Sequence, residues 1–117
     1  MGIRLIVSDV DDTLIDHSLT LSPRTRRALD LARQKGVRFT IATGRMFDST
    51  TPFIDILDVH EPVICCQGAV TIDPDTRNVT HHLPVGQDIA RDILAYTDRI
   101  GLYGQYYSLD KYYIQDV

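Results

Sequence analysis

The sequence predicts an α/β fold in which a doubly wound parallel sheet is followed by a smaller unit of mixed strands and helix. Three observations lead to this prediction. Short apolar runs alternate with helix-like segments over the first half of the chain. The links between them are short, which favours right-handed crossovers and parallel strands. After Gly68 the pattern changes to short strand pairs around one amphipathic segment, which places a boundary near residues 68–84.

Each element of the first half has a local signal. Residues 3–8 are nearly all apolar, as expected of a strand that is covered on both faces. Ser22 and Pro23 suit the N-cap and first position of a helix that continues to Lys35 and stops at Gly36. The other expected elements are a strand over 37–42, a helix over 46–57 that is kinked or restarted at Pro52, and a strand over 63–66.

The second half begins with two short strands within residues 69–83, around a turn rich in Pro and Asp. Apolar residues recur with helical spacing over 87–100, and Gly101 marks the end of that helix. Two aromatic-rich strands flank residues 108–111, and we expect their tyrosines to pack within this unit rather than to form a stacking surface for a ligand. We therefore predict a first domain over 1–83 and the start of a second over 84–117.

Composition narrows the function classes. The chain has 117 residues, 44% of them hydrophobic and 24% charged, which suits a small globular domain. The net charge of −4 and the absence of a basic cluster argue against a nucleic-acid partner. No apolar stretch is long enough to span a bilayer, and the N-terminus lacks a signal-peptide pattern. Cys65 and Cys66 are adjacent, so we expect reduced, buried strand residues and a cytoplasmic protein.

Four carboxylates follow the first predicted strand within eight positions. Odd spacing puts Asp9 and Asp11 on the same side of an extended chain, with Val10 pointing away. The carboxyl ends of strands in an open α/β sheet border the ligand-binding crevice. For Asp12 and Asp16 we favour a simpler role, in which the carboxylate only caps a turn.

The second predicted strand ends in "ATGR", on the same edge of the sheet. Thr43 can donate a hydrogen bond, Gly44 lets the backbone come close to a ligand, and Arg45 can bind phosphate as a fork. Carboxylates beside such a phosphate-binding set make sense when a divalent cation lies between them. Mg²⁺ is the natural candidate, because it prefers oxygen ligands together with substrate phosphate.

These residues carry a family resemblance. "DVDDTL" resembles the D-x-D-x-T motif of the haloacid dehalogenase (HAD) superfamily, and "ATGR" resembles its second motif. "SPRTRRAL", then "ATGR" and "VICCQGA", are similar to the Cof-type branch with a type IIB cap. The resemblance implies a HAD-like Rossmannoid parallel-sheet core, incomplete here, with the beginning of an α+β cap domain. It also implies a Mg²⁺-dependent phosphatase of small phosphorylated metabolites, such as sugar phosphates, that forms an aspartyl-phosphate.

Residue roles follow from the resemblance by position. Asp9 would be the nucleophile, and Asp11 would be the general acid and then the general base. The Asp9 carboxylate and the Asp11 main-chain carbonyl would bind Mg²⁺. Thr13 would fix the loop, while Thr43 would bind the transferring phosphoryl group and Arg45 would hold substrate. The substrate-binding set is thus Thr13, Thr43, Gly44 and Arg45.

The sequence also departs from the family pattern. The family needs a lysine and a later acidic G-D-x-x-x-D segment, whereas this chain has only Lys35, at the wrong edge, and Lys111. We therefore predict the N-terminal portion of a longer phosphatase, inactive alone, whose first strand is an open edge prone to self-association. Gln67 stands where the Cof-type branch usually has Asn, and Asp12 where many members have Gly.

Two other function classes were weighed. One is a non-catalytic module that keeps the fold and acts only through association. The other is a receiver domain, which would require Asp at the end of the third strand, where this chain has Cys65, Cys66 and Gln67; we reject it. His81 and His82 lack a third metal ligand nearby, so we expect them on a strand surface.

Overall fold

The computed structural model describes residues 2–16, 19–109 and 111–114. The chain divides into two compact units, residues 1–82 and 83–117. Each unit is considered by itself.

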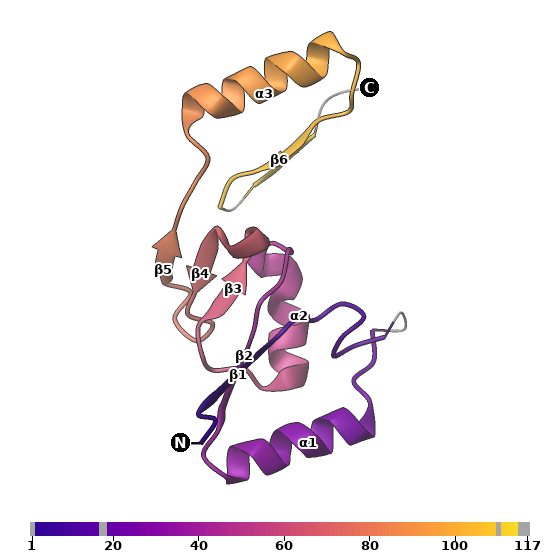
Figure 1. Cartoon of the computed structure of the whole chain (residues 1–117), viewed down its shortest axis with the longest axis vertical. Helices are drawn as coiled ribbons and strands as arrows, with labels where there is room; N and C mark the ends of the chain where they lie inside the picture. The colour runs from indigo at the N-terminus through magenta and orange to yellow at the C-terminus, as the bar shows by residue number, and fades with distance from the viewer. Residues whose placement is uncertain (1, 17–18, 110, 115–117) are drawn as a thin grey trace. The chain divides into compact units, whose positions relative to one another are not determined.

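A parallel ladder of strands forms the centre of the first unit (Figure 1). Strand β1 (Leu5–Ser8) pairs in parallel with β2 (Arg38–Ile41), in a register that sets Ser8 opposite Ile41. A parallel bridge between Ala42 and Ile64 links the end of β2 to β3 (Val63–Cys65). The predicted α/β class with parallel strands is confirmed.

The first helix, α1 (Pro23–Gln34), begins and ends as its sequence predicts. The Ser22 hydroxyl accepts a hydrogen bond from the Thr25 N–H at 3.0 Å, and Pro23 occupies the first helical position. Gly36, with φ of +74°, follows the C-cap and allows the chain to turn into β2.

Helix α2 (Phe47–Leu57) is one helix across Pro52, so the expected interruption is not seen as a break. Its first turn is secured by side chains: the Thr50 hydroxyl donates to the Met46 carbonyl at 2.8 Å. A proline removes one main-chain donor, but a helix packed against a core tolerates this loss. The face of α2 that packs on the core carries the buried residues Phe47, Phe53, Ile54 and Leu57.

An antiparallel sheet completes the first unit. Strand β3 pairs with β4 (Val70–Ile72), and β4 pairs with β5 (Val79–His82). A short turn, η1 (Cys66–Gly68), joins β3 to β4, so the third strand ends one residue earlier than expected. On β5, His81 and His82 are exposed, as predicted.

The hydrophobic core of the described residues lies within the first unit. Its fully buried members include Ile41, Leu57, Val10, Val63 and Cys65. Strand β1 contributes little to this core. Its side chains alternate between exposed and half-buried positions, and Leu5 and Val7 are 41% and 47% exposed. The expectation that this strand is covered on both faces was therefore wrong for the described chain, because no described element packs on that face or pairs with its outer edge.

The second unit contains helix α3 (Gln87–Arg99) and a hairpin of β6 (Gln105–Tyr107) and β7 (Tyr112–Ile114). Two tyrosine pairs face each other across the hairpin; Tyr106 and Tyr113 stack with ring centroids 4.9 Å apart. None of the described residues of this unit is buried. The predicted helix and strands are present without a core of their own.

Candidate active site

The register of β1 and β2 brings the two predicted motifs side by side. The Ala42 N–H donates to the Ser8 carbonyl at 2.9 Å, so the ends of both strands lie at the same edge. Val10 is 0% exposed, while Asp9 is exposed and Asp11 is half-buried. The odd spacing of the carboxylates thus gives the expected arrangement: Val10 anchors the loop and both acids face outward.

The loop after β1 is held by one carbonyl. Val10 accepts main-chain hydrogen bonds from Thr13 at 3.4 Å, Leu14 at 3.0 Å and Ile15 at 3.1 Å. Asp12, with φ of +55°, adopts the left-handed conformation that glycine takes most readily and that Asp tolerates. Backbone geometry is therefore enough to account for the acid at position 12.

Asp16 caps a turn, as favoured from the sequence. Its carboxylate accepts a hydrogen bond from the Thr20 N–H at 3.2 Å, and its carbonyl accepts one from Leu19 at 2.9 Å. These bonds give Asp16 a structural role in the turn that leads to α1.

The main polar contact of the site joins Asp11 to Arg45. The Arg45 Nε donates to Asp11 Oδ2 at 2.8 Å, and Nη2 donates to Oδ1 at 2.6 Å, a bidentate pair between residues 34 positions apart. The hydrogen bond and charge of Arg45 lower the pKa of Asp11, and Asp11 raises the pKa of Arg45. Asp11 is therefore held in its carboxylate form in this arrangement.

Arg45 is supported from two further sides. Its guanidinium carbon lies 4.9 Å from the centroid of the Phe53 ring, a cation–π contact with helix α2. Its main-chain N–H donates to the Thr43 hydroxyl oxygen at 3.2 Å. The role of Phe53 was not predicted, because on sequence alone it is one apolar residue of an amphipathic helix; only the packing of α2 places it beneath Arg45.

Thr43 lies at the end of β2 and is 6% exposed. Its N–H donates to the Ile64 carbonyl at 2.9 Å, which ties the loop to β3. Because the hydroxyl oxygen accepts the Arg45 N–H, the hydroxyl hydrogen remains available to a ligand. Thr13 differs: it is exposed, and among the described contacts its hydroxyl has no hydrogen bond.

Gly44 has a specific neighbour. A Cβ at this position would collide with the carboxamide of Gln67, and its distance to the Gln67 Cδ would be 2.9 Å. Gln67 and Cys66 both have left-handed backbones, with φ of +57° and +52°. Such conformations cost about 1 kcal/mol or more for non-glycine residues. Through this contact the side chain of Gln67, which follows the third strand, covers Gly44 of the "ATGR" loop.

The turn at the end of β3 also holds the two cysteines, which are both free. Cys65 is buried in the strand as expected, and burial raises the pKa of its thiol to about 11. Cys66 is only half-buried and begins the η1 turn, so its assignment to the strand was wrong. Its N–H donates to the Arg45 carbonyl at 2.9 Å, which binds the two loops together.

The described residues also bear on metal binding. They contain no group of three or more His, Cys, Asp or Glu residues placed to hold a metal ion. The Asp9 carboxylate is exposed, and no hydrogen bond or ion pair to it is found within the described residues. Lys35 caps the far end of α1, before β2 begins, and so lies away from the strand ends that carry Asp9 and Thr43.

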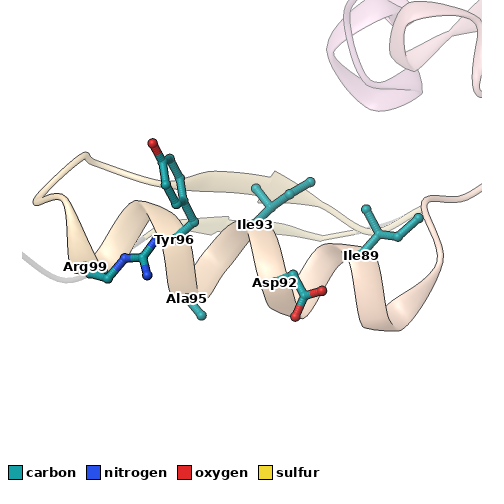
Figure 2. A pocket seen from close by; sticks show the side chains of 6 residues that line it. All are labelled: Ile89, Asp92, Ile93, Ala95, Tyr96 and Arg99. Carbon is teal, nitrogen blue, oxygen red and sulfur yellow. The ribbon is translucent and has the colours of Figure 1, made fainter.

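A shallow hollow lies elsewhere, along α3 in the second unit (Figure 2). Ile89, Ile93 and Tyr96 line it together with Asp92, Ala95 and Arg99, and none of the predicted site residues belongs to it.

Among the described helices, none combines the length and apolar character needed to cross a membrane.

Comparisons with known proteins show the family of the chain. The profile of haloacid dehalogenase-like hydrolases matches residues 6–117. The pyridoxal phosphate phosphatase YbhA of Escherichia coli is 35% identical over 85 residues, which are 73% of this chain and 31% of that protein. The phosphatase YwpJ of Bacillus subtilis is 30% identical over 100 residues, 86% of this chain and 35% of that protein.

A solved structure of the HAD subclass IIB sugar phosphatase BT4131 shares the fold. It superposes with a TM-score of 0.80 at 20% identity and covers 95% of this chain, which spans 43% of that protein. The chain thus spans about a third of the length of these curated relatives. The predicted resemblance to Cof-type HAD proteins is confirmed. The chain belongs to the family of haloacid dehalogenase-like hydrolases.

Proposed function

We propose that this chain supplies the nucleophile and phosphate-binding loop of a Mg²⁺-dependent phosphatase that acts through an aspartyl-phosphate. One observation carries the proposal: the exposed Asp9 carboxylate and the Thr43–Arg45 loop follow adjacent parallel strands in direct register. This arrangement supports the roles of Asp9 as a nucleophile and of the Thr43–Arg45 loop as a set of donors suited to a phosphate group.

The chemistry follows from the side chains. A carboxylate oxygen of Asp9 forms a bond to phosphorus as the bond to the leaving oxygen breaks, and Asp11, in its protonated form and no longer paired as in the resting arrangement, donates a proton to that oxygen. In the second half, water attacks the phosphorus, Asp11 takes up the water proton, and the bond to Asp9 breaks. The Thr43 hydroxyl and the Arg45 guanidinium would bind the phosphoryl oxygens throughout.

Mg²⁺ would be held by the Asp9 carboxylate and the Asp11 main-chain carbonyl. The exposed carboxylate of Asp9, which has no partner among the described residues, fits this role. When bound, the cation would offset the repulsion between carboxylates and the phosphoryl dianion. Two protein ligands are few, so we propose that a longer polypeptide supplies the remaining acidic ligand and the lysine.

The substrate class is a small phosphorylated metabolite such as a sugar phosphate. The names of the relatives support the class: one acts on pyridoxal phosphate, and the structural neighbour is a sugar phosphatase. The two free cysteines support a cytoplasmic location, where thiols stay reduced.

The test uses the longer polypeptide proposed above, with p-nitrophenyl phosphate as a general substrate. Activity should be lost in EDTA and restored by Mg²⁺, and rapid acid quenching should trap phosphate on Asp9. Full activity in EDTA, or no trapped phosphate on Asp9, would contradict the proposal. Residues 1–117 alone should show no Mg²⁺-dependent turnover.

A second candidate function is association without catalysis. The outer edge of β1 is unpaired in the described chain, and Ile3, Leu5 and Val7 are 75%, 41% and 47% exposed beside it. Light scattering of residues 1–117 as a function of concentration tests this. Dimers that a Val7→Lys substitution dissociates would support pairing through β1, and a monomer at all concentrations would exclude it.

A further inference from the structure

The Asp11–Arg45 pair creates a conflict between the two roles assigned to its members. Both Nε and Nη2 of Arg45 are used by the two oxygens of one carboxylate. Those two donors form the fork that would hold a phosphate group. In this arrangement Arg45 therefore cannot offer the same fork to a substrate, and Asp11 cannot direct both oxygens at a leaving group.

The pair is open to exchange from the solvent side. The side chain of Arg45 is 35% exposed and that of Asp11 is 45% exposed. Water and salt compete for an ion pair this exposed, so a competing anion can reach and displace it. A phosphate dianion carries more charge than a carboxylate and accepts the same two parallel hydrogen bonds.

The two partners are held differently. Arg45 is fixed by the Phe53 ring and by its N–H bond to Thr43, neither of which depends on Asp11. The backbone around Asp11 is fixed through the Val10 carbonyl, but among the described residues its carboxylate is held by Arg45. An arriving phosphate could thus replace the carboxylate while Arg45 stays in place and Asp11 changes rotamer.

We propose that Arg45 binds two anions in turn: it positions the Asp11 carboxylate in the resting site, then takes the phosphate group of an arriving substrate and releases Asp11. Arg45 is thereby a positioning residue for Asp11 as well as a phosphate ligand. The inference rests on the proposed function, because it assumes that a phosphate group reaches this loop. No bond other than hydrogen bonds is made or broken in the exchange.

The experiment measures binding of inorganic phosphate to residues 1–117, by titration followed in ¹H–¹⁵N spectra of the arginine Nε–H groups. In the wild-type chain the Arg45 Nε–H should stay hydrogen-bonded throughout, while the ¹³C resonance of the Asp11 carboxyl moves as phosphate saturates. Asp11→Asn should bind phosphate about fivefold more tightly than wild type, because the internal competitor no longer holds the fork.

Asp12→Asn is the matched control, since it removes the same charge one residue away. It should change phosphate affinity by about twofold at most, as expected of an exposed charge. Arg45→Gln in the Asp11→Asn background should abolish the gain. Equal affinity for wild type and Asp11→Asn, an equal gain in Asp12→Asn, or a gain that survives Arg45→Gln would overturn the inference.

If a variant folds poorly, the phosphate titration of the wild-type chain decides whether the exchange occurs. An Asp11 carboxyl resonance that does not move at saturating phosphate, or the absence of any phosphate binding, would also overturn the exchange. The outcome is separate from that of the proposed function. Exchange in this chain without turnover in the longer polypeptide would refute the phosphatase alone, and turnover without exchange would refute this inference alone.

Discussion

The two units of the chain use the same kinds of element with different support. In the first unit, helix α2 and strands β2 and β3 bury Ile41, Leu57 and Val63 almost completely. In the second, helix α3 has apolar residues with helical spacing, yet Ile89, Ile93 and Tyr96 remain 59%, 53% and 53% exposed. The local sequence pattern produces a helix in both units, but only the helices of the first unit pack against a hydrophobic core.

This difference affects where in the chain a functional site can form. A site needs side chains held by packing from several directions, as Arg45 is held by Thr43, Phe53 and Asp11. The exposed stripe of α3 has no such support among the described residues. We therefore expect substitutions in the first unit to have much larger effects than similar substitutions in the second.

The largest effect is expected for the proposed nucleophile. Asp9→Asn, in the longer polypeptide, should lower kcat by about 10³-fold or more, because an amide cannot attack phosphorus. Asp16→Asn is the control: its carboxylate caps the turn to α1, so kcat should stay within about threefold. Steady-state kinetics with p-nitrophenyl phosphate provides the measurement. If Asp9→Asn kept half of the wild-type activity, Asp9 would not be the nucleophile, and the reaction would have to depend on residues outside this unit.

A pair of large-to-alanine substitutions compares the two helices directly. Leu57→Ala, at a position 1% exposed on α2, should lower the free energy of unfolding by about 2–5 kcal/mol through lost burial and a cavity. Ile93→Ala, at a position 53% exposed on α3, should lower it by about 0.5 kcal/mol or less. Urea unfolding followed by circular dichroism measures both. Equal losses would mean that α3 is buried in solution, for example against a second copy.

Helix capping offers a smaller contrast. Ser22→Ala should destabilise the first unit by about 1 kcal/mol, because the Thr25 N–H loses its acceptor. Helix α3 begins at Gly86, which has no side-chain cap bond, so Gly86→Ser should stabilise that helix by a few tenths of a kcal/mol. Amide hydrogen exchange in each helix would resolve these changes. A loss in α3 on Gly86→Ser would argue against the observed start of that helix.

A small effect on stability is also expected at Gly44. Gly44→Ala should cost less than about 1 kcal/mol, because the side chain of Gln67 is flexible and can move away. The Gln67 side-chain amide resonances should nevertheless shift. Gly86→Ala is the matched control, since a Cβ there meets no atom within 4 Å. Unchanged Gln67 resonances in Gly44→Ala would show that the carboxamide does not lie over the glycine in solution.

Much of the first unit could be predicted from local pattern. The Ser22–Pro23 start of α1, its end at Gly36 and the burial of Val10 between two outward-facing acids all follow from rules that act within a few residues. The shared edge for Asp9 and Thr43 follows from parallel strands. Short-range sterics and hydrogen bonding decide these features, so the sequence displays them directly.

Other features required the tertiary structure. The Asp11–Arg45 pair spans 34 positions, and the cover of Gly44 by Gln67 depends on how the η1 turn follows β3. The exposure of β1 could not be read from its apolar residues, because the pattern shows what a strand can bury and not whether a partner is present. The sequence by itself thus determined the elements and the edge that carries the acids. Only the folded chain decided which acid the arginine holds, because that choice depends on loops that meet in space.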